Sequence, residues 1–430
     1  MRILLTNAHY AVVDSLRPFA EHIAVLVQAN RSIDRLVPAA AAYSKHIDSR
    51  IKMFSPGNDW HSGRMNEGNT QREEDYITAL IDICARERIN VIFPASDPDV
   101  YVLSKNKSRF SEHDVAVLVP EFSTTKILLD KYATIRFAEE CGFPIPRTYM
   151  PKNADDFAEI FTELSPPYVV RPRQSQHAYG FEIVSTRDEL ADRYAAASRE
   201  FEAPIIQEYV PGREKQNFYA VTDANGNVVH VSCPRIVRYR NRLFQNSSAS
   251  CVSSHSHPDL DKVIHMIEQL GWRGCLTVQT KIDSRDGVGK LMEINPRISA
   301  HAFYMTEAGV NAPLLAVDNW RQTGFKAETP QEDVLFLEPF EDLFGLPFEL
   351  IDRIVFTLRT RLLNRAPIDT SNLPLPLLDT LRTYASNYFG KQKKAVDPIS
   401  RNIFSDPVPA ILSLYASGVY SLLRYPKIGR

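Results

Sequence analysis

The run from Lys290 to Tyr304, KLMEINPRISAHAFY, places oxygen-bearing side chains at one end of an apolar segment. Residues two positions apart in a β-strand point to the same face, so Glu293 and Asn295 would lie side by side. If GCLTVQTKIDSRDGVGKLMEINPR forms a hairpin with its turn centred near Asp286, Gln279 lies across from Glu293 to within a residue of register. Such carboxylate and amide oxygens suit a hard cation such as Mg²⁺, with phosphates and water as its other ligands. We therefore expect a metal site and a nucleotide triphosphate; the alternative is a strand that simply ends in an Asn-Pro turn.

Composition excludes several other classes of protein. The 430 residues carry a formal charge of −2 with acids and bases interspersed, so nothing favours nucleic acid as a partner. The five cysteines show no CxxC spacing, which indicates free thiols in a reducing compartment. The N-terminal segment lacks the long apolar stretch of a signal peptide. We expect a cytoplasmic protein of two or three domains.

The elements that position these residues fall into an α/β part and an α+β part. Over the first hundred residues, short apolar strands alternate with helical segments, as in a parallel Rossmann-like layer. Its first turn, TNAHYAVVD, has no glycine, which argues against a nicotinamide dehydrogenase. Ser96 and Asp97 follow the strand VIFPA, where such sheets place ligand groups; the alternative is a helix N-cap. The middle of the chain reads as antiparallel hairpins with helices, and the part beyond residue 325 as helices.

The motif Glu-x-Asn-Pro-Arg, with a glutamine on the preceding strand, resembles the ATP-grasp superfamily and, within it, the carbamoyl phosphate synthetase large-subunit branch. The resemblance implies a Rossmann-like pre-ATP-grasp domain over residues 1–120 and an ATP-grasp domain over 121–325, with a lid subdomain at about 150–208. A helical extension would occupy residues 326–430. It also implies ATP and two Mg²⁺ ions as cofactors, with Mn²⁺ as a substitute. The metal ligands would be Gln279, Glu293 and Asn295.

The same resemblance assigns catalytic and nucleotide contacts. Arg297, just past the metal ligands, would steady an acyl phosphate and the later oxyanion. Lys131 in LLDKYATIRFA and Arg171 in YVVRP would bind phosphates, one as a point charge and one as a planar fork. Glu214 would accept from the ribose hydroxyls. For Lys131, Arg171 and Glu214 the alternative is a solvated surface charge. The segment IIQEYVPGRE resembles the hinge whose backbone holds the adenine edge, at Gln207, Glu208, Tyr209 and Val210.

The loop between the first two lid strands departs from the family pattern. It reads RQSQHAYG, in which Gly180 is the single glycine. The family's loop is rich in glycines, whose backbone amides wrap the phosphates. Either Ser175, Gln176 and His177 supply side-chain donors instead, or the lid closes less tightly.

The segment SCPRIVRYRNRLFQNSSASCVSS alternates arginines with apolar and aromatic residues. Nucleic-acid stacking is one interpretation of such a pattern. Recognition of a substrate carboxylate or phosphate is the better one, because the family's architecture places the metal site nearby. We expect Arg235 and Arg238 to bind substrate together with Asp97.

Near the C-terminus, no charged residue occurs between Pro407 and Leu423, and apolar residues recur there at helical spacing. The stretch is too short and too polar to predict a transmembrane span. We expect it to pack on the ATP-grasp domain or against a second copy in a homodimer. Contact with an anionic membrane surface is the alternative.

Together these features predict an ADP-forming ligase for two small molecules, a carboxylate and an amine. ATP would phosphorylate the carboxylate of an amino acid or other metabolite, and the amine would displace phosphate to leave an amide. This chemistry needs metal ions, cationic clamps and alignment but no covalent nucleophile. One alternative is an ATP-dependent carboxylase or carbamoyl phosphate-forming enzyme, although EINPR is not repeated in the chain. Another is a nucleotide-binding scaffold with weakened catalysis.

Overall fold

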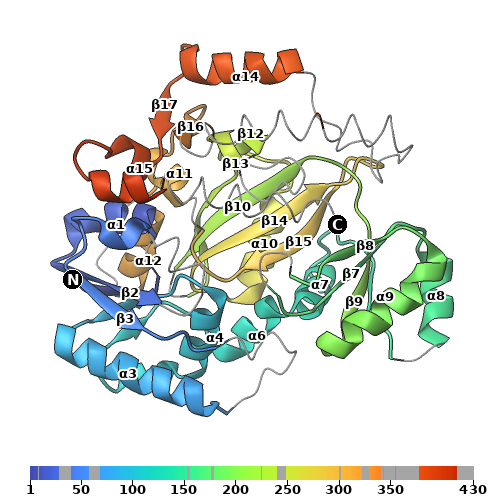
Figure 1. The fold of residues 1–430 in the computed structure, drawn as a ribbon, viewed down its shortest axis with the longest axis horizontal. Coiled ribbons are helices and arrows are strands. Elements are labelled where there is room, and N and C mark those ends of the chain that lie inside the picture. The colour runs from blue at the N-terminus through green and yellow to red at the C-terminus, as the bar shows by residue number, and fades with distance from the viewer. Residues whose placement is uncertain are drawn as a thin grey trace.

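The structure of the protein is a computed structural model, in which a long central sheet lies between an N-terminal domain, a smaller lid on the opposite side, and a C-terminal extension (Figure 1). The mixed α/β architecture confirms the predicted fold class. The described residues are 1–7, 9–28, 40–57, 68–152, 155–175, 179–223, 225–239, 248–299, 302–321, 329–339, 342, 354 and 377–413.

A parallel sheet forms the N-terminal domain. Its strands are β1 (Arg2–Leu5), β2 (His22–Gln28), β3 (Ser49–Met53), β4 (Val91–Phe93) and β5 (Ala116–Val117), in the order β3-β2-β1-β4-β5. The helical segments are α1 (Tyr10–Leu16), η1 (Arg17–Phe19), η2 (Ala40–Tyr43), α3 (Gln71–Glu87), α4 (Asp97–Lys105) and α5 (Lys107–Ser111). From β1 the chain adds β2 and β3 on one side of this strand, and β4 and β5 then follow on its other side. The carboxyl ends of β1 and β4 therefore border the crevice where open α/β sheets bind ligands.

A buried carboxylate fixes the turns at that crevice. Asp99 accepts hydrogen bonds from Thr6 Oγ1 at 2.7 Å, Tyr76 OH at 2.8 Å and Ser96 Oγ at 2.6 Å. Burial raises the pKa of Asp99, against the opposing effect of these hydrogen bonds. Because its partners are the residue that follows β1, a residue of α3 and the residue that caps α4, the network ties the end of β1 to the start of α4. The N-cap interpretation of Ser96 is confirmed.

Two helices, α6 (Phe122–Leu129) and α7 (Lys131–Glu140), lead out of this domain. The sequence pattern from Ser123 to Gly142 predicts one continuous helix, and this expectation is wrong at Asp130. The Asp130 carboxylate accepts from the backbone amides of Tyr132 and Ala133, so it caps a new helix instead of extending the old one. Lys131 thereby becomes the first residue of α7.

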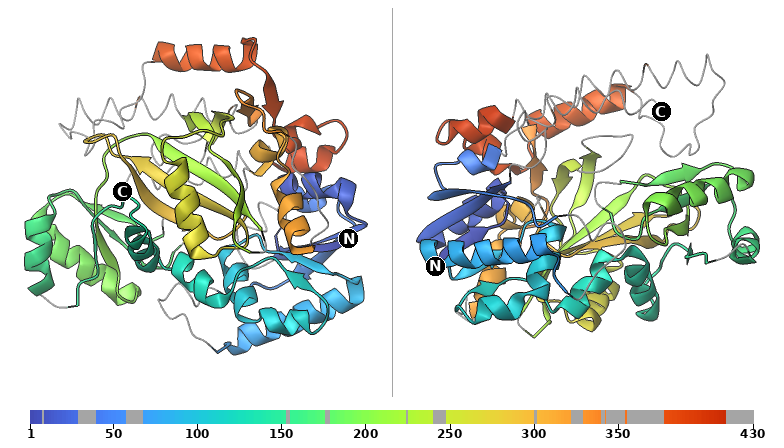
Figure 2. Two further views of the ribbon diagram at one scale, coloured as in Figure 1. Left: turned by 180° about the vertical axis from the view of Figure 1, so that it is seen from behind. Right: turned by 60° about the horizontal axis from the view of Figure 1, so that its bottom comes forward.

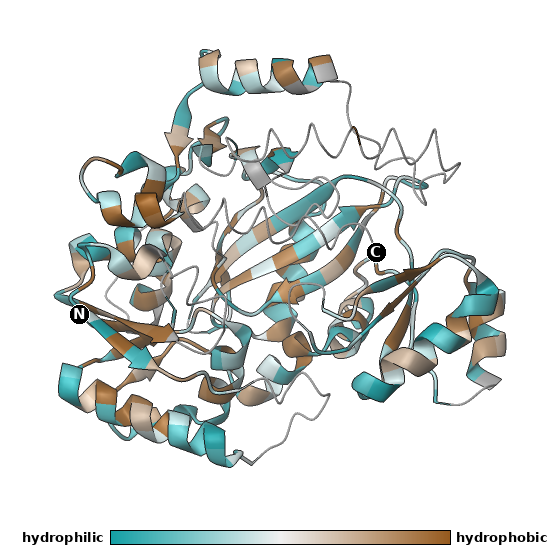
Figure 3. Cartoon of the chain, in the orientation of Figure 1, coloured by the Kyte–Doolittle hydropathy of each residue, from teal (hydrophilic) through white to brown (hydrophobic). Residues whose placement is uncertain are grey.

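The lid is a small antiparallel sheet with two helices. Its elements are β6 (Thr148–Tyr149), α8 (Asp155–Glu163), β7 (Tyr168–Arg171), β8 (Glu182–Val184), α9 (Arg187–Glu200) and β9 (Ile205–Glu208), with strand order β6-β9-β7-β8. Hydrophobic residues dominate β7 and β9, whereas α9 is largely hydrophilic (Figure 3). The lid therefore has its own core, beneath one face of its sheet.

The central sheet is antiparallel, with strand order β11-β10-β14-β15. Its elements are β10 (Lys215–Thr222), β11 (Val228–Ser232), β14 (Gly274–Ile282) and β15 (Gly289–Asn295), with helix α10 (Leu260–Leu270) against it. Hydrophobic and hydrophilic residues alternate along β10, β14 and β15 (Figure 3). The apolar face packs on α10, which covers the sheet when the molecule is seen from behind (Figure 2). The opposite face carries polar side chains such as Asn217 and Gln279 at one end, while Tyr219 and Val221 on the same face pack in another apolar cluster.

The extension carries strands as well as helices. Its elements β16 (Leu335–Leu337), α14 (Leu377–Phe389), β17 (Lys394–Val396) and α15 (Pro398–Arg401) follow α11 (Ala302–Glu307) and α12 (Ala312–Arg321). Strands β12 (Arg235–Tyr239) and β13 (Ser248–Val252), from the middle of the chain, join β16 and β17 in one sheet. This sheet contains strands from both sides of residue 325, and the domain boundary expected there stays a prediction. Among the described helices, none combines the length and the apolar character that crossing a membrane requires. Most of the stripe expected beyond Pro407 lies outside the described residues; Ile411, within them, is exposed.

The extension also returns to the N-terminal domain. The buried Asp406 carboxylate accepts hydrogen bonds from Tyr10 OH at 3.0 Å, from Ser44 Oγ, and from the Lys45 amide at 3.2 Å. Nearby, Arg401 pairs with Asp14 on α1 at 2.6 Å. The last described part of the chain is thus bound to the first helix.

Candidate active site

The predicted metal ligands lie together on the polar face of the central sheet. Gln279 stands directly opposite Glu293 in the β14–β15 pair and opposite Asn217 in the β10–β14 pair, which confirms the expected register. Gln279 Nε2 donates to Asn217 Oδ1 at 2.9 Å, and Asn295 Nδ2 donates to Glu293 Oε1 at 3.1 Å. Each amide donates its NH₂ group to a neighbouring side chain, so its oxygen remains available to bind a cation.

This donor set fits Mg²⁺ bound to a nucleotide. The described residues contain no group of three or more His, Cys, Asp or Glu side chains that could hold a metal ion. A cation at Glu293 would therefore depend on the oxygens of Gln279 and Asn295, and on phosphate and water. Mg²⁺ is commonly held in this way, by one or two carboxylates plus substrate phosphates.

Three cationic side chains surround Glu293. Arg171 ends β7, and Lys131 begins α7 and donates from Nζ to the Ser175 carbonyl at 2.7 Å. Burial lowers the pKa of Arg171 and of Lys215, and in each case the charge of Glu293 opposes the shift. The structure thus brings both predicted phosphate ligands to the metal ligands, although they come from different elements.

The pKa of Lys131 predicts a pH-dependent affinity for ATP. Burial, aided by the charge of Arg171, lowers this pKa to about 8. Bound phosphates would favour the charged ammonium and raise the pKa again, so binding above pH 8 must take up a proton. Affinity should hold below that pH and then fall by up to about tenfold per pH unit. Calorimetry from about pH 7 to 9, in buffers of different ionisation enthalpy, measures both effects.

Lys131→Arg is the matched control for that experiment, since guanidinium remains charged over this range. The variant should bind ATP with a flatter pH profile and less proton uptake. An unchanged profile would show that another group titrates.

Lys215 was not anticipated from the sequence. Asn217 faces the metal ligands, so the two-residue repeat of β10 places Lys215 on the same face. Glu214, just before the strand, is exposed. Counting back in twos from Asn217 would have selected Lys215 from the sequence. The ribose contact of Glu214 stays a prediction.

The expected adenine hinge is held by a network of charges. Glu208, at the end of β9, accepts from the Arg147 amide at 3.1 Å and from Arg285 Nη2 at 2.5 Å. Lys290 lies 3.5 Å from the same carboxylate. These partners lower the pKa of Glu208, although burial alone would raise it. The backbone that follows Glu208 is therefore fixed from several sides.

Two further features shape this hinge. Lys281 Nζ donates to the Val210 carbonyl at 2.7 Å and lies 5.2 Å from the centre of the Tyr209 ring, so a cation stands at the expected adenine edge. Gly212 has φ +128°, and a Cβ atom there would lie 2.3 Å from the Ile282 carbonyl oxygen. Only glycine fits this turn, which brings the hinge against the end of β14. Gln207 is buried and its Oε1 accepts from Arg171 Nη1 at 3.4 Å.

Asp97 and Arg297 join the N-terminal domain to the metal ligands. Arg297 Nε donates to Asp97 Oδ1 at 2.8 Å, at the carboxyl end of β4. His9, the residue before α1, lies close enough that burial and the charge of Arg297 lower its pKa to about 4. A neutral imidazole, a carboxylate and a guanidinium therefore meet at the crevice between the β1 and β4 ends.

The other predicted substrate ligands are not brought to this place by a described contact. Arg235 is exposed, and the buried Arg238 pairs with Asp342 and lies 4.0 Å from the centre of the Tyr384 ring. Both substrate roles stay predictions. Gln176 and His177 lie outside the described residues.

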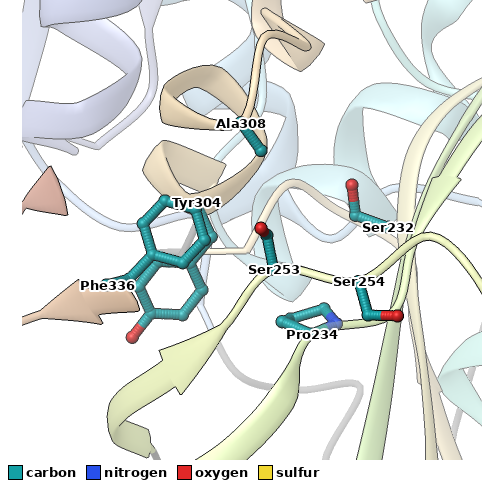
Figure 4. A pocket seen from close by; sticks show the side chains of 7 residues that line it. All are labelled: Ser232, Pro234, Ser253, Ser254, Tyr304, Ala308 and Phe336. Atoms are coloured by element: carbon teal, nitrogen blue, oxygen red, sulfur yellow. The ribbon is translucent and has the colours of Figure 1, made fainter. Parts of the chain in front are cut away.

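Two hollows flank α11 near this site. One is a shallow depression lined by Ser232, Pro234, Ser253, Ser254, Tyr304, Ala308 and Phe336 (Figure 4). The rings of Tyr304 and Phe336 stack on one side of it, 5.1 Å between centroids, and the serines stand opposite. The other has room for about one water molecule and borders Thr277, which stands opposite Asn295 in the β14–β15 pair.

Comparisons with known proteins agree with this geometry. A family described as "ATP-grasp in the biosynthetic pathway with Ter operon" matches residues 200–342, and one described as "PylC-like, N-terminal domain" matches residues 70–118. The biotin carboxylase of Campylobacter jejuni, solved as a β,γ-ATP complex, superposes with a TM-score of 0.60 at 14% identity, over 78% of this chain and 74% of its own.

Two curated relatives are similar in sequence. The carbamoyl phosphate synthase large chain, N-terminal section, of Methanopyrus kandleri is 24% identical over 46% of this chain, which spans 36% of that protein. The D-aspartate ligase of Enterococcus faecium is 22% identical over 72% of this chain and 74% of its own length.

The lid and the central sheet, which carries the predicted metal ligands, form an arrangement that suits a nucleotide held between them. The match of residues 200–342 to an ATP-grasp family agrees with this arrangement.

Proposed function

We propose that the protein is an ADP-forming carboxylate–amine ligase. The observation that carries this proposal is the arrangement around Glu293, with Arg171 and Lys131 on its lid side and the Arg297–Asp97 pair at the N-terminal domain. Charges for a triphosphate thus stand on one side of the metal ligands, and a guanidinium for a carboxylate on the other. The similarity to a D-aspartate ligase supports the same reaction class.

In the first step, a carboxylate oxygen of the substrate attacks the γ-phosphorus of ATP, the bond to the β–γ bridging oxygen breaks, and ADP leaves. Arg171 and Lys131 hold the phosphates in line, as fixed charge in a site with little water. Gln279, Glu293 and Asn295 would hold two Mg²⁺ ions, or Mn²⁺ in their place, which neutralise charge on the phosphates.

In the second step, the amine attacks the acyl carbon and phosphate leaves, so the amine loses a proton and an amide remains. Arg297 donates toward the oxyanion of the tetrahedral species. Asp97 accepts from Nε of Arg297 at 2.8 Å and so fixes the guanidinium beside the carboxyl end of β4. We place this enzyme in the cytoplasm, acting on small molecules.

Trapping the acyl phosphate tests this reaction. Hydroxylamine, added with ATP, Mg²⁺ and pools of carboxylates, should yield a hydroxamate together with ADP and phosphate, because acyl phosphates react readily with this nucleophile. Omitting the carboxylate is the control and should abolish the hydroxamate. AMP and pyrophosphate would contradict the proposal by indicating adenylation. Carboxylation of a substrate with bicarbonate would favour the carboxylase alternative.

A further inference from the structure

The start of the lid loop RQSQHAYG, residues 173–175, is bound to the first turn of α7, which lies beside the lid (Figure 1). Two of the contacts come from Lys131. Its backbone amide donates to the Arg173 carbonyl at 2.9 Å, and its Nζ donates to the Ser175 carbonyl at 2.7 Å. The third contact is an ion pair, in which Arg173 Nε donates to Asp130 Oδ1 at 3.1 Å and Nη2 donates to Oδ2. The loop and the helix are thus joined by backbone and side chains together.

The ion pair is better placed than a typical surface pair. Asp130 is 3% exposed, and the same carboxylate accepts from the amides of Tyr132 and Ala133 as the cap of α7. The Arg173 side chain is 26% exposed and meets the carboxylate with two nitrogens. A bidentate pair with one partner nearly buried is stronger than an exposed pair, and removing one partner leaves an uncompensated charge. The pair therefore fixes where the loop begins relative to α7.

The Ser175 carbonyl orients the Lys131 ammonium. Nζ has three N–H donors, and this carbonyl accepts from one of them, so two remain for phosphate oxygens. A lysine side chain has many rotamers, and its ammonium is well placed only where a neighbour holds it. Glycine-rich loops bind phosphates through backbone amides, whereas this loop presents a carbonyl to a cation. The position of that carbonyl depends on Arg173, two residues before it.

We infer that Arg173 is a positioning residue of the nucleotide site, because its pairing with Asp130 holds the loop where the Ser175 carbonyl directs the Lys131 ammonium toward the phosphates of ATP. Arg173 needs no contact with the nucleotide for this role. Without Arg173, the carboxylate of Asp130 would lose its guanidinium and would compete with phosphate for the ammonium. The inference rests on the phosphate-binding role of Lys131 in the proposed function, and it holds for any carboxylate substrate.

Arg173→Gln should weaken MgATP binding by about five- to tenfold near neutral pH, because the Lys131 ammonium stays charged but loses its orientation. Calorimetry at fixed Mg²⁺ and salt measures this change. Adenosine, which has no phosphate, should bind the variant as tightly as it binds the unmodified chain. A residue needed only to fold the lid would weaken both ligands, and that result would overturn the inference. Arg173→Lys keeps a charge for Asp130 and should give an intermediate ATP affinity.

A double-mutant cycle shows whether Arg173 acts through Lys131. In a Lys131→Met background, where no ammonium is left to orient, Arg173→Gln should change ATP affinity by less than about twofold. A full loss that persists in this background would show that Arg173 binds the phosphates itself, and the positioning role would be rejected. Unchanged ATP affinity in the single Arg173→Gln variant would reject it as well.

Arg193→Gln is the matched control, since it breaks an ion pair of the same lid, with Glu182 at 3.1 Å, that does not involve α7. This variant should bind ATP as the unmodified chain does. The titrations need no carboxylate, so they decide the inference even if no acyl phosphate is trapped and the ligase proposal fails. Absence of ATP binding by the unmodified chain would overturn the inference together with the nucleotide site.

Discussion

Glu293→Gln should abolish ATP turnover while the chain stays folded. The substitution keeps the shape of the side chain and removes the charge that stands opposite Gln279. Since the described residues offer no acidic cluster as a substitute, the cation would be left with amide oxygens alone. Even losing a partner that merely orients a metal ligand costs about ten- to a hundredfold, so losing this carboxylate should cost at least about a hundredfold.

Phosphate release at saturating Mg²⁺ measures this effect, and circular dichroism checks the fold. Glu112→Gln, an exposed acid that follows α5, is the control and should turn over normally. Turnover of the Glu293 variant at the rate of the unmodified chain would remove this residue from the metal site.

Arg171→Lys should weaken ATP binding by about ten- to a hundredfold. Arg171 is 8% exposed at the end of a lid strand, and its Nη1 donates a long hydrogen bond of 3.4 Å to Gln207 Oε1. A guanidinium can grip a phosphate with two hydrogen bonds, whereas an ammonium offers a point charge. Loss of one charge-assisted bond is worth about 1.5–3 kcal/mol, and 1.4 kcal/mol corresponds to about tenfold. Lys131→Arg should be milder near neutral pH, because it keeps the charge.

Calorimetry at fixed Mg²⁺ and salt measures both affinities. Arg193→Lys is the control, since Arg193 is a half-exposed arginine of the same lid that pairs with Glu182 at 3.1 Å. Unchanged affinity in Arg171→Ala would exclude Arg171 from the nucleotide site.

Sequence patterns predicted that Gln279, Glu293 and Asn295 lie together because this grouping depends on local periodicity. The alternation of β15 placed Glu293 beside Asn295, and the short turn near Asp286 set the register of Gln279. The parallel order of the first sheet followed in the same way from alternating strands and helices. These features are determined within one hairpin or one repeat of the fold.

What escaped prediction depends on distant contacts or on competition between local preferences. The partner of Arg238, Asp342, lies 104 residues further along the chain, and no spacing rule connects the two. The pairing of Asp97 with Arg297 spans 200 residues. The helix break at Asp130 was missed because apolar residues continue at helical spacing on both sides of it, while the carboxylate prefers to cap.

The contact between Tyr10 and Asp406 has a consequence for how the molecule is made, since the two residues are 396 positions apart. At typical rates of synthesis, on the order of 20 to 80 s pass between their emergence from the ribosome. During that time the carboxylate of Asp406 has not yet been synthesised. Tyr10, on the first helix beside the candidate active site, and Ser44 therefore stay hydrated until Asp406 emerges. The N-terminal sheet can form early from its own apolar residues. The packing of the segment around Asp406 against α1 is therefore a late step in the folding of this protein.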